Sequence, residues 1–265
     1  AAAFIIVAAA CTQAALTPRA DSLMARRGLR SLEEAVDLYE KALAVETKPD
    51  PMLQLKLADA LNGVMRVKTN ANTLVVDRLL DTPVNKEVWG KLGPRALELA
   101  TEARKARPRD VRAAAVYADA YMFSCSSKGI IKQALQGAAS VFKANAERLI
   151  NMDKKYDNGV GYALLGAFYA VAPWPYGNMD LAAKNMDMAK KVAPTKRNLY
   201  YVGVIAFKQK QWERATEHFR LALNARPGSP TEWDFAEFME SECKRAAAMA
   251  QTELQKCTAA SDTRR

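Results

Sequence analysis

Apolar residues recur at every third or fourth position along most of the chain, the spacing that places them on one face of an α-helix. We expect helices over residues 21–46, 51–67, 86–106, 110–124, 129–152, 158–171, 179–192, 196–209, 212–225 and 231–257. Residues 74–80 are the most strand-like run, but they include charged positions, and we expect a loop or a short helix there. The last helix should begin at Ser229, which can cap it ahead of Pro230 and Glu232. The pattern therefore predicts an all-α fold.

A longer regularity links these helices: an alanine, a large residue four positions on, an alanine three further and a proline five after that. Two helices approach closely only where the crossing residues are small, and proline ends a helix because it has no N–H. The helices between the copies carry small residues at the matching place, namely Ala58, Gly166 and Gly203. The copies are Ala35, Tyr39, Ala42 and, two residues late, Pro49; Ala96, Ala100, Ala103 and Pro108; Ala182, Met186, Ala189 and Pro194; Ala215, Phe219, Ala222 and Pro227.

These positions resemble the tetratricopeptide repeat (TPR) over about residues 31–227. The resemblance implies a TPR-like right-handed α-solenoid of helix pairs, which we place at residues 19–258, with the long helix 231–257 as its C-terminal cap. Residues 1–18 form a separate hydrophobic segment, and residues 259–265 form a polar tail that we expect to fray.

Three stretches depart from the repeat, at residues 69–87, 124–129 and 172–178. Loops longer than about 12 residues in a compact domain tend to be functional, and the first stretch exceeds that length. The third stretch is rich in proline and aromatic residues, and we take its Trp174 and Tyr176 as candidate partner-binding residues. The alternative is that the three inserts only cover exposed edges of the core.

Residues 150–227 also resemble the T component of TRAP-type transporters and its organellar relatives. The likeness rests on the run NMDKKYDNG at 151–159, the Tyr-x2-Leu-Gly-x2-Tyr helix after it and the proline-rich insert. Bacterial members of that family are envelope lipoproteins that form oligomers and are thought to touch a solute-binding partner. The resemblance implies an accessory role in solute binding or transport and transfers no catalytic residue.

The composition argues against an enzyme. The chain has one histidine, His218, whereas general acid–base sites and zinc sites draw on histidine more than on most side chains. We expect His218 at the surface. Cys125 is the only plausible nucleophile, and no histidine is expected beside it. The other cysteines, Cys11, Cys243 and Cys257, are too scattered for a metal site. We expect no catalytic residue, no metal and no cofactor.

The net charge of +10 gathers at two repeat junctions, near residues 104–112 and 190–197. Cations near helix C-termini interact favourably with the helix dipole, which explains part of this charge. We expect an acidic protein surface or anionic lipid as the counter-charge, and not nucleic acid, because no recognised nucleic-acid module accompanies the patches. The positions expected on the concave, ligand-facing side of the repeats carry no set of residues that would clamp a carboxylate ligand. An aromatic groove is more natural, and its candidate residues, each of which could instead be core, are Tyr117, Tyr121, Tyr200 and Phe207.

Residues 1–16 are apolar but shorter than the roughly 20 residues that span a bilayer. They could be a retained membrane-contacting segment or mature organellar N-terminus, the remnant of an uncleaved signal, or a lipid anchor on Cys11. The basic flank that follows includes Arg26, Arg27 and Arg30 and could lie on anionic headgroups, or be a solvated linker.

Together these features predict a non-enzymatic TPR-like scaffold for protein–protein interaction. We expect a subunit or assembly and stability factor of a membrane-associated organellar complex, with a photosynthetic complex of the plastid thylakoid favoured over a mitochondrial or bacterial-envelope location. The alternative is the T-component-like accessory protein.

Overall fold

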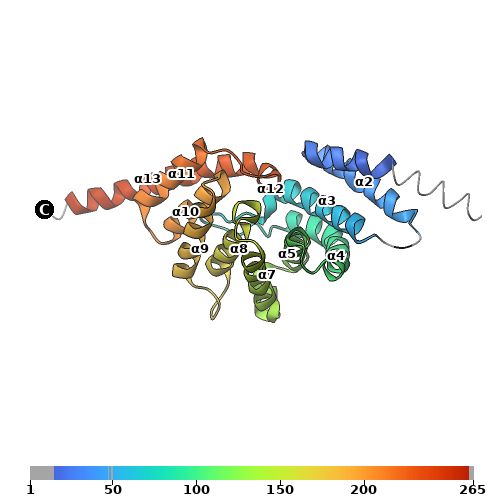
Figure 1. Cartoon of the computed structure of the whole chain (residues 1–265). Helices are drawn as coiled ribbons and strands as arrows, with labels where there is room; N and C mark the ends of the chain where they lie inside the picture. Colours follow the sequence, from blue (N-terminus) through green and yellow to red (C-terminus); the bar gives the residue numbers. More distant parts are fainter. Residues whose placement is uncertain (1–14, 47, 49, 263–265) are drawn as a thin grey trace, which may run out of the picture. The chain divides into compact units, whose positions relative to one another are not determined.

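The computed structural model describes residues 15–46, 48 and 50–262, and all of their regular secondary structure is helical (Figure 1). Residues 1–14, which make up most of the predicted hydrophobic segment 1–18, lie outside the described residues. Within the described part, none of the helices is long and apolar enough to cross a membrane.

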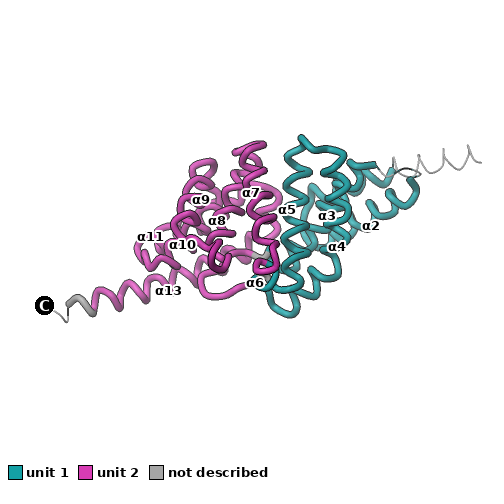
Figure 2. The backbone as a smooth tube through the Cα atoms, turned by 90° about the horizontal axis from the view of Figure 1, so that it is seen from below, with its two compact units in different colours: residues 1–72, 81–133 teal, residues 73–80, 134–265 magenta. Residues whose placement is uncertain are grey.

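The chain divides into two compact units, coloured separately in Figure 2. Unit 1 comprises residues 1–72 and 81–133, and unit 2 comprises Thr73–Leu80 and residues 134–265. Residues 73–80 therefore belong to unit 2 although their neighbours on both sides in the sequence belong to unit 1.

Unit 1 is a set of antiparallel helices. A helical stretch at residues 15–26 precedes α2 (Leu29–Ala44), α3 (Pro51–Thr69), α4 (Pro83–Ala106), α5 (Val111–Ser126) and the single turn α6 (Ile130–Gln133). Helix α3 packs against α2 and α4, and α4 packs against α5. The side chains of Asp50, Thr82 and Asp110 accept backbone N–H bonds at the starts of α3, α4 and α5, which fixes where these helices begin.

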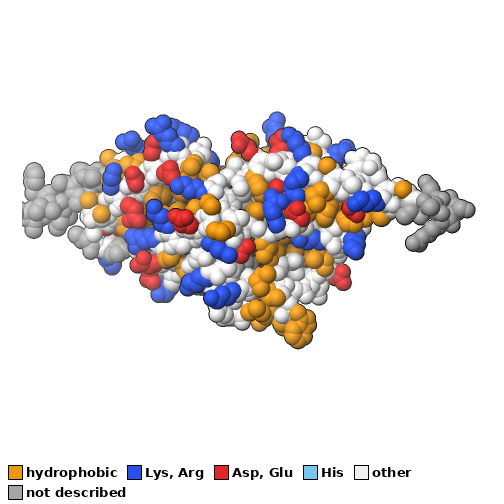
Figure 3. Space-filling model, turned by 180° about the vertical axis from the view of Figure 1, so that it is seen from behind, with side chains coloured by type: hydrophobic (Ala, Val, Ile, Leu, Met, Phe, Trp, Pro, Cys, Tyr) orange, Lys and Arg blue, Asp and Glu red, His pale blue; other side chains and the backbone are white. Residues whose placement is uncertain are grey.

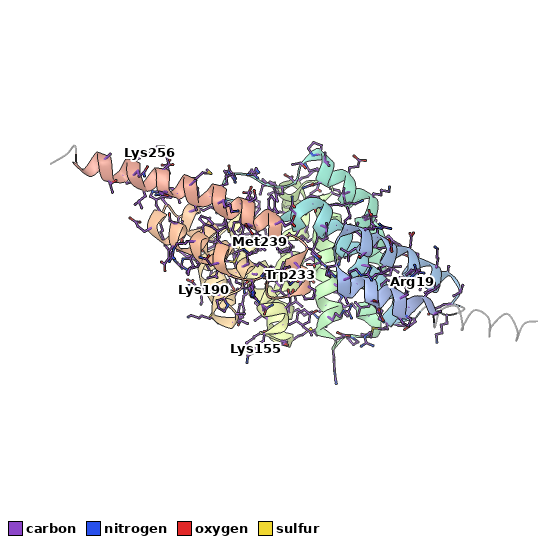
Figure 4. All side chains as sticks on the ribbon, turned by 90° about the horizontal axis from the view of Figure 1, so that it is seen from above. Arg19, Lys155, Lys190, Trp233, Met239 and Lys256 are labelled. Carbon is purple, nitrogen blue, oxygen red and sulfur yellow. The ribbon has the colours of Figure 1, made fainter. Side chains whose placement is uncertain are left out.

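Unit 2 continues with helices packed in pairs. They are α7 (Ala139–Met152), α8 (Val160–Val171), α9 (Met179–Val192), α10 (Lys196–Lys208), α11 (Trp212–Asn224), α12 (Pro230–Trp233) and α13 (Ala236–Asp262). Helix α8 packs on α9, α10 on α11, and α11 on α13. Met239 lies near the start of α13, and Lys256 lies far along it, where the helix has passed the other helices of its unit (Figure 4).

Small residues bring the paired helices together. A Cβ atom at Gly203 of α10 would come within 2.7 Å of the Phe219 ring of α11, and one at Gly166 of α8 within 3.0 Å of Met186 of α9. The alanines of the repeat, including Ala58, Ala96, Ala182 and Ala215, are fully buried. In these two copies the large residue, Phe219 or Met186, thus fills the space beside the small one, and Pro227 follows the end of α11.

Three of the predicted helices are broken, two of them at a backbone that a helix cannot continue. The helix predicted at 21–46 is interrupted at Arg27 and Gly28, where φ is 60° and 80°. The helix predicted at 129–152 is interrupted at Gly137, where φ is 100°. Such positive φ values favour glycine and end a helix. Ser229 caps its helix through the Glu232 N–H as predicted, but α12 stops at Trp233 before α13 begins. Helix α13 also runs to Asp262, into the predicted tail.

Candidate partner-binding site

The insert at residues 172–178 forms a fixed turn between α8 and α9. The Asn178 N–H donates to the Tyr169 carbonyl at 3.0 Å, and the Tyr176 N–H donates to the Pro173 carbonyl at 2.9 Å. The Asn178 side chain accepts the Leu181 N–H at 3.0 Å and so starts α9. The backbone of the turn is therefore held from both flanking helices, and its side chains project from a defined frame.

Trp174 and Tyr176 project differently from this turn. Trp174 is 88% exposed, whereas Tyr176 is 39% exposed and places its ring edge-on to Phe168, with 6.2 Å between ring centroids. Phe168 in turn stacks on Phe142 of α7 at 5.9 Å. Tyr176 is thus supported by the core of unit 2, and Trp174 is available to another molecule.

Further exposed apolar side chains lie at the same end of unit 2. Helices α7 and α8 are antiparallel neighbours, so the start of α7 lies beside the end of α8. Hydrophobic side chains gather at the lower edge of the face shown in Figure 3, around the turn from α8 to α9. We call this region the apolar end, and its exposed members are Leu135, Val141, Trp174, Tyr176 and Leu181.

The tyrosine pair of α5 lies in unit 1 and is half-buried. Tyr117 and Tyr121 stack with 6.1 Å between centroids, and the Arg104 guanidinium lies 3.4 Å from the centre of the Tyr117 ring. Tyr121 shares a hydrogen bond with Cys125, and burial raises the pKa of both the Tyr121 phenol and the Cys125 thiol. The Cys125 thiol is therefore protonated at neutral pH, which is the inactive form of a nucleophile.

Tyr200 is not at a surface. It is fully buried, with its ring 5.9 Å from that of Phe219. The charged and thiol groups of Glu242 and Cys243 on α13 act on it, so it faces the interior between α10, α11 and α13. Phe207, further along α10, is half-buried and packs edge-on against Trp212 at 5.1 Å. Tyr200 is therefore a core residue, which is the alternative that the sequence left open, and Phe207 packs against an aromatic side chain of its own unit.

The three arginines of the basic flank have separate positions. Arg26 is exposed, and Arg30 is exposed with its Nε 3.0 Å from the Glu34 carboxylate. Arg27 is half-buried and lies close enough to α3 to act on Asp59. Two of the three arginines are therefore placed to meet a charged partner.

A charge network that the sequence did not reveal links α3 to α5 in unit 1. Arg66 of α3 lies 2.7 Å from Asp119 of α5, and Arg112 of α5 lies 2.9 Å from Asp59 of α3. Burial alone would raise the pKa of the Asp59 carboxyl, but the two arginines outweigh it and hold that pKa below its usual range. The sequence contained a pattern that could have predicted this network. Asp59 and Arg66 are seven residues apart and share a helix face, and so do Arg112 and Asp119.

A second network, in unit 2, uses the two buried cations of the predicted junction at 190–197. Lys196 donates to the Ala222 and Leu223 carbonyls at the end of α11, at 3.1 and 3.2 Å. Arg197 lies 3.3 Å from Glu232 and 3.6 Å from Asp157. Lys196 and Arg197 therefore pair with carbonyl and carboxylate groups of unit 2.

His218 is buried, contrary to the surface position expected from the sequence. Its Nδ1 lies 2.9 Å from the Arg214 carbonyl of α11, and its Nε2 lies 3.2 Å from the Lys190 ammonium of α9. Among the described residues, no group of three or more His, Cys, Asp or Glu side chains could hold a metal ion.

Solved structures share this fold. A thermophilic TPR protein of Thermus thermophilus matches over 87% of this chain and 98% of its own, with a TM-score of 0.58 and 16% sequence identity. The MamA protein matches over 86% of this chain and 95% of its own, with a TM-score of 0.48 and 14% identity. Protein-family models and curated protein sequences give no match. The likeness to the Thermus protein shows the fold alone, which is all-helical and TPR-like.

Proposed function

We propose that this chain is a non-enzymatic scaffold that binds a protein partner through the apolar end of unit 2. The observation that carries the proposal is Trp174, which is 88% exposed on a turn whose backbone is fixed by hydrogen bonds. A large aromatic side chain on a rigid frame loses little conformational entropy on binding, and such residues often supply most of the binding energy at an interface.

In this proposal the partner is a subunit of a membrane-associated complex, and we favour a complex of the plastid thylakoid. The support comes from the apolar sequence of residues 1–16 and from the exposed Arg26 and Arg30 that follow it. Basic residues beside an apolar segment are attracted to anionic headgroups. In this arrangement the basic flank would contact lipid while the apolar end of unit 2 contacts the protein subunit.

The T-component-like alternative makes a different demand on the same insert. It requires Trp174 and Tyr176 to line a pocket or pore that receives a solute. Trp174 is 88% exposed in the single chain, so such a pocket would have to be completed by other subunits. The exposed position favours a docking role, and the alternative would be supported by an oligomer in which these two residues bind a small molecule.

Affinity purification from native membranes tests the proposal. We expect the tagged wild-type chain to retain a stoichiometric membrane protein, and the Trp174→Ala chain to lose most of it. Trp233→Ala is the matched control, because Trp233 is 58% exposed in the same unit but lies on α12, near the opposite end of α8. Recovery of monomer alone from the wild type, or equal capture by both variants, would refute the proposal.

A further inference from the structure

Residues 73–80 form an extended segment that is buried in unit 2. They adopt no regular secondary structure, yet Thr73, Leu74, Val75, Val76 and Leu80 are at most 7% exposed. Loops normally run over the surface because their backbone groups need hydrogen-bond partners. The burial of this segment therefore requires that another element supply partners and a complementary apolar surface.

Helix α10 supplies partners along one face. The Tyr201 side chain hydrogen-bonds with the Leu74 backbone and with the Thr73 hydroxyl. Seven residues further on, the Lys208 ammonium donates to the Val76 carbonyl at 3.2 Å. Positions seven apart lie on the same side of a helix, so the segment runs along one side of α10 from Tyr201 to Lys208. Burial lowers the pKa of the Lys208 ammonium, and the Asp77 carboxylate of the segment opposes this effect.

Helix α13 forms ion pairs with the two charged residues of the segment, Asp77 and Arg78. The Arg78 guanidinium lies 2.8 Å from Glu242, and the Asp77 carboxylate accepts bonds from both terminal nitrogens of Arg245, at 2.8 and 2.9 Å. Arg245 also bonds Glu242 at 2.6 Å. The four charges alternate in sign around a ring, and the Glu242 side chain is only 6% exposed, so this buried carboxylate depends on Arg78 and Arg245.

These contacts have the form of peptide recognition. Side chains of a helix bond the backbone of an extended segment, apolar residues fill the surface beside it, and a charge pair fixes its position along the groove. Since residues 73–80 belong to the same chain, they act at an effective concentration on the order of millimolar, and an external peptide must compete with them.

We propose that α10 and α13 form a peptide-binding groove, that residues 73–80 occupy it as an internal ligand, and that a partner's extended segment of the same chemistry binds by replacing them. The partner segment would carry apolar, partly β-branched residues followed by an acidic and a basic residue. This inference rests on the proposed function as a protein-binding scaffold and names a second, regulated site for it.

A labelled peptide with the sequence of residues 73–80 tests the groove in the full chain. We expect weak binding to the wild type and at least about tenfold tighter binding to a chain whose residues 73–80 are replaced by Gly and Ser at equal length. The double variant Asp77→Ala, Arg78→Ala removes only two exposed side chains and should give an intermediate affinity. It replaces the first variant if circular dichroism shows that the first one has unfolded. A peptide with the order of its Asp and Arg exchanged is the control.

Equal peptide affinity for the wild type and a folded variant, or equal binding of the exchanged peptide, would overturn the inference. The readout is independent of the apolar end, so Trp174→Ala should leave peptide binding unchanged. Loss of native partner capture in Trp174→Ala with no peptide binding in any variant would leave the proposed function standing and remove the groove. Peptide binding with no capture of a partner from membranes would support the groove and refute the proposed function.

Discussion

Arg197 and Glu232 form a buried ion pair in which Nη2 and Oε1 are 3.3 Å apart and the two side chains are 5% and 0% exposed. Glu232 also accepts a bond from the Thr195 hydroxyl at 2.9 Å and from the Gly228 N–H at 2.9 Å. The pair joins the start of α10 to α12, and every oxygen of the carboxylate has a partner. Removing Arg197 leaves the Glu232 carboxylate buried without a cation, whereas removing the Glu232 charge leaves the buried Arg197 with Asp157, 3.6 Å away, as its counter-ion.

We therefore expect Arg197→Met to lower the free energy of unfolding by about 3 kcal/mol, and Glu232→Gln to lower it by less, because Arg197 keeps Asp157 as a partner. The double variant should cost less than the sum of the two, because each single variant already removes the interaction that the two side chains share. Urea unfolding followed by circular dichroism measures all three. Strict additivity of the two losses would show that the side chains act independently.

Gly203 provides a test of the close approach of α10 and α11. A Cβ at this position would come within 2.7 Å of the Phe219 ring, so Gly203→Ala should destabilise the chain by about 1–3 kcal/mol. Gly90 of α4 is the matched control, since the nearest atom to its Cβ would be 3.9 Å away and the residue is exposed. Gly90→Ala should stabilise by about 0.5–1 kcal/mol, because alanine loses less backbone entropy than glycine in a helix.

A thermal unfolding series measures both changes. Combining Gly203→Ala with Phe219→Leu should recover part of the loss, because leucine leaves room for the added methyl group. A Gly203→Ala chain as stable as the wild type would mean that the two helices separate without cost.

The sequence predicted most of the fold because helix periodicity and small-residue spacing are local signals. Gly203 and Phe219 are a repeat pair in the sequence and also touch in the structure. The predictions that missed depend on what packs from elsewhere. Tyr200 was a candidate groove residue by its place on α10, but α13 covers it, and no pattern in the sequence states where α13 packs.

The same limit applies to residues 73–80. The sequence correctly predicted that residues 74–80 form no strand and that residues 69–87 are a long insert. Where residues 73–80 pack is set by contacts with residues more than 100 positions away in the sequence. The charge ring between Asp77 and Arg245 could not be anticipated, because neither spacing nor composition couples such distant residues. Trp174 differs, since a proline-rich insert already favours an exposed aromatic side chain.

His218 is expected to titrate below its ordinary range. Burial lowers its pKa and the Lys190 ammonium adds to this effect, while the bond to the Arg214 carbonyl opposes it. The lysine donates to Nε2, so Nδ1 carries the proton of the neutral ring and donates to that carbonyl. The unfolded chain therefore takes up a proton more readily than the folded chain as the pH falls below about 6.5.

Stability should consequently decline between about pH 7.5 and 5.5 in the wild type, and the decline should be smaller in His218→Gln. Because the chain has one histidine, a nuclear magnetic resonance titration of the imidazole reports this pKa without overlap. A pKa at or above about 6.5, or an identical pH profile in the variant, would contradict the expectation.

Trp89 of α4 is fully buried and donates its indole N–H to the Thr69 hydroxyl at 2.9 Å. The same hydroxyl donates to the Met65 carbonyl at 2.7 Å, so Thr69 both accepts and donates at the end of α3. Thr69→Val keeps the shape of the side chain but leaves the indole N–H without its acceptor. We expect a loss of about 1–3 kcal/mol in the free energy of unfolding, the cost of one unsatisfied buried donor. Thr69→Ser keeps the hydroxyl and should cost less, since only a methyl group is removed. Chemical unfolding followed by tryptophan fluorescence distinguishes the two variants, and equal losses would show that packing of the methyl group outweighs the hydrogen bond.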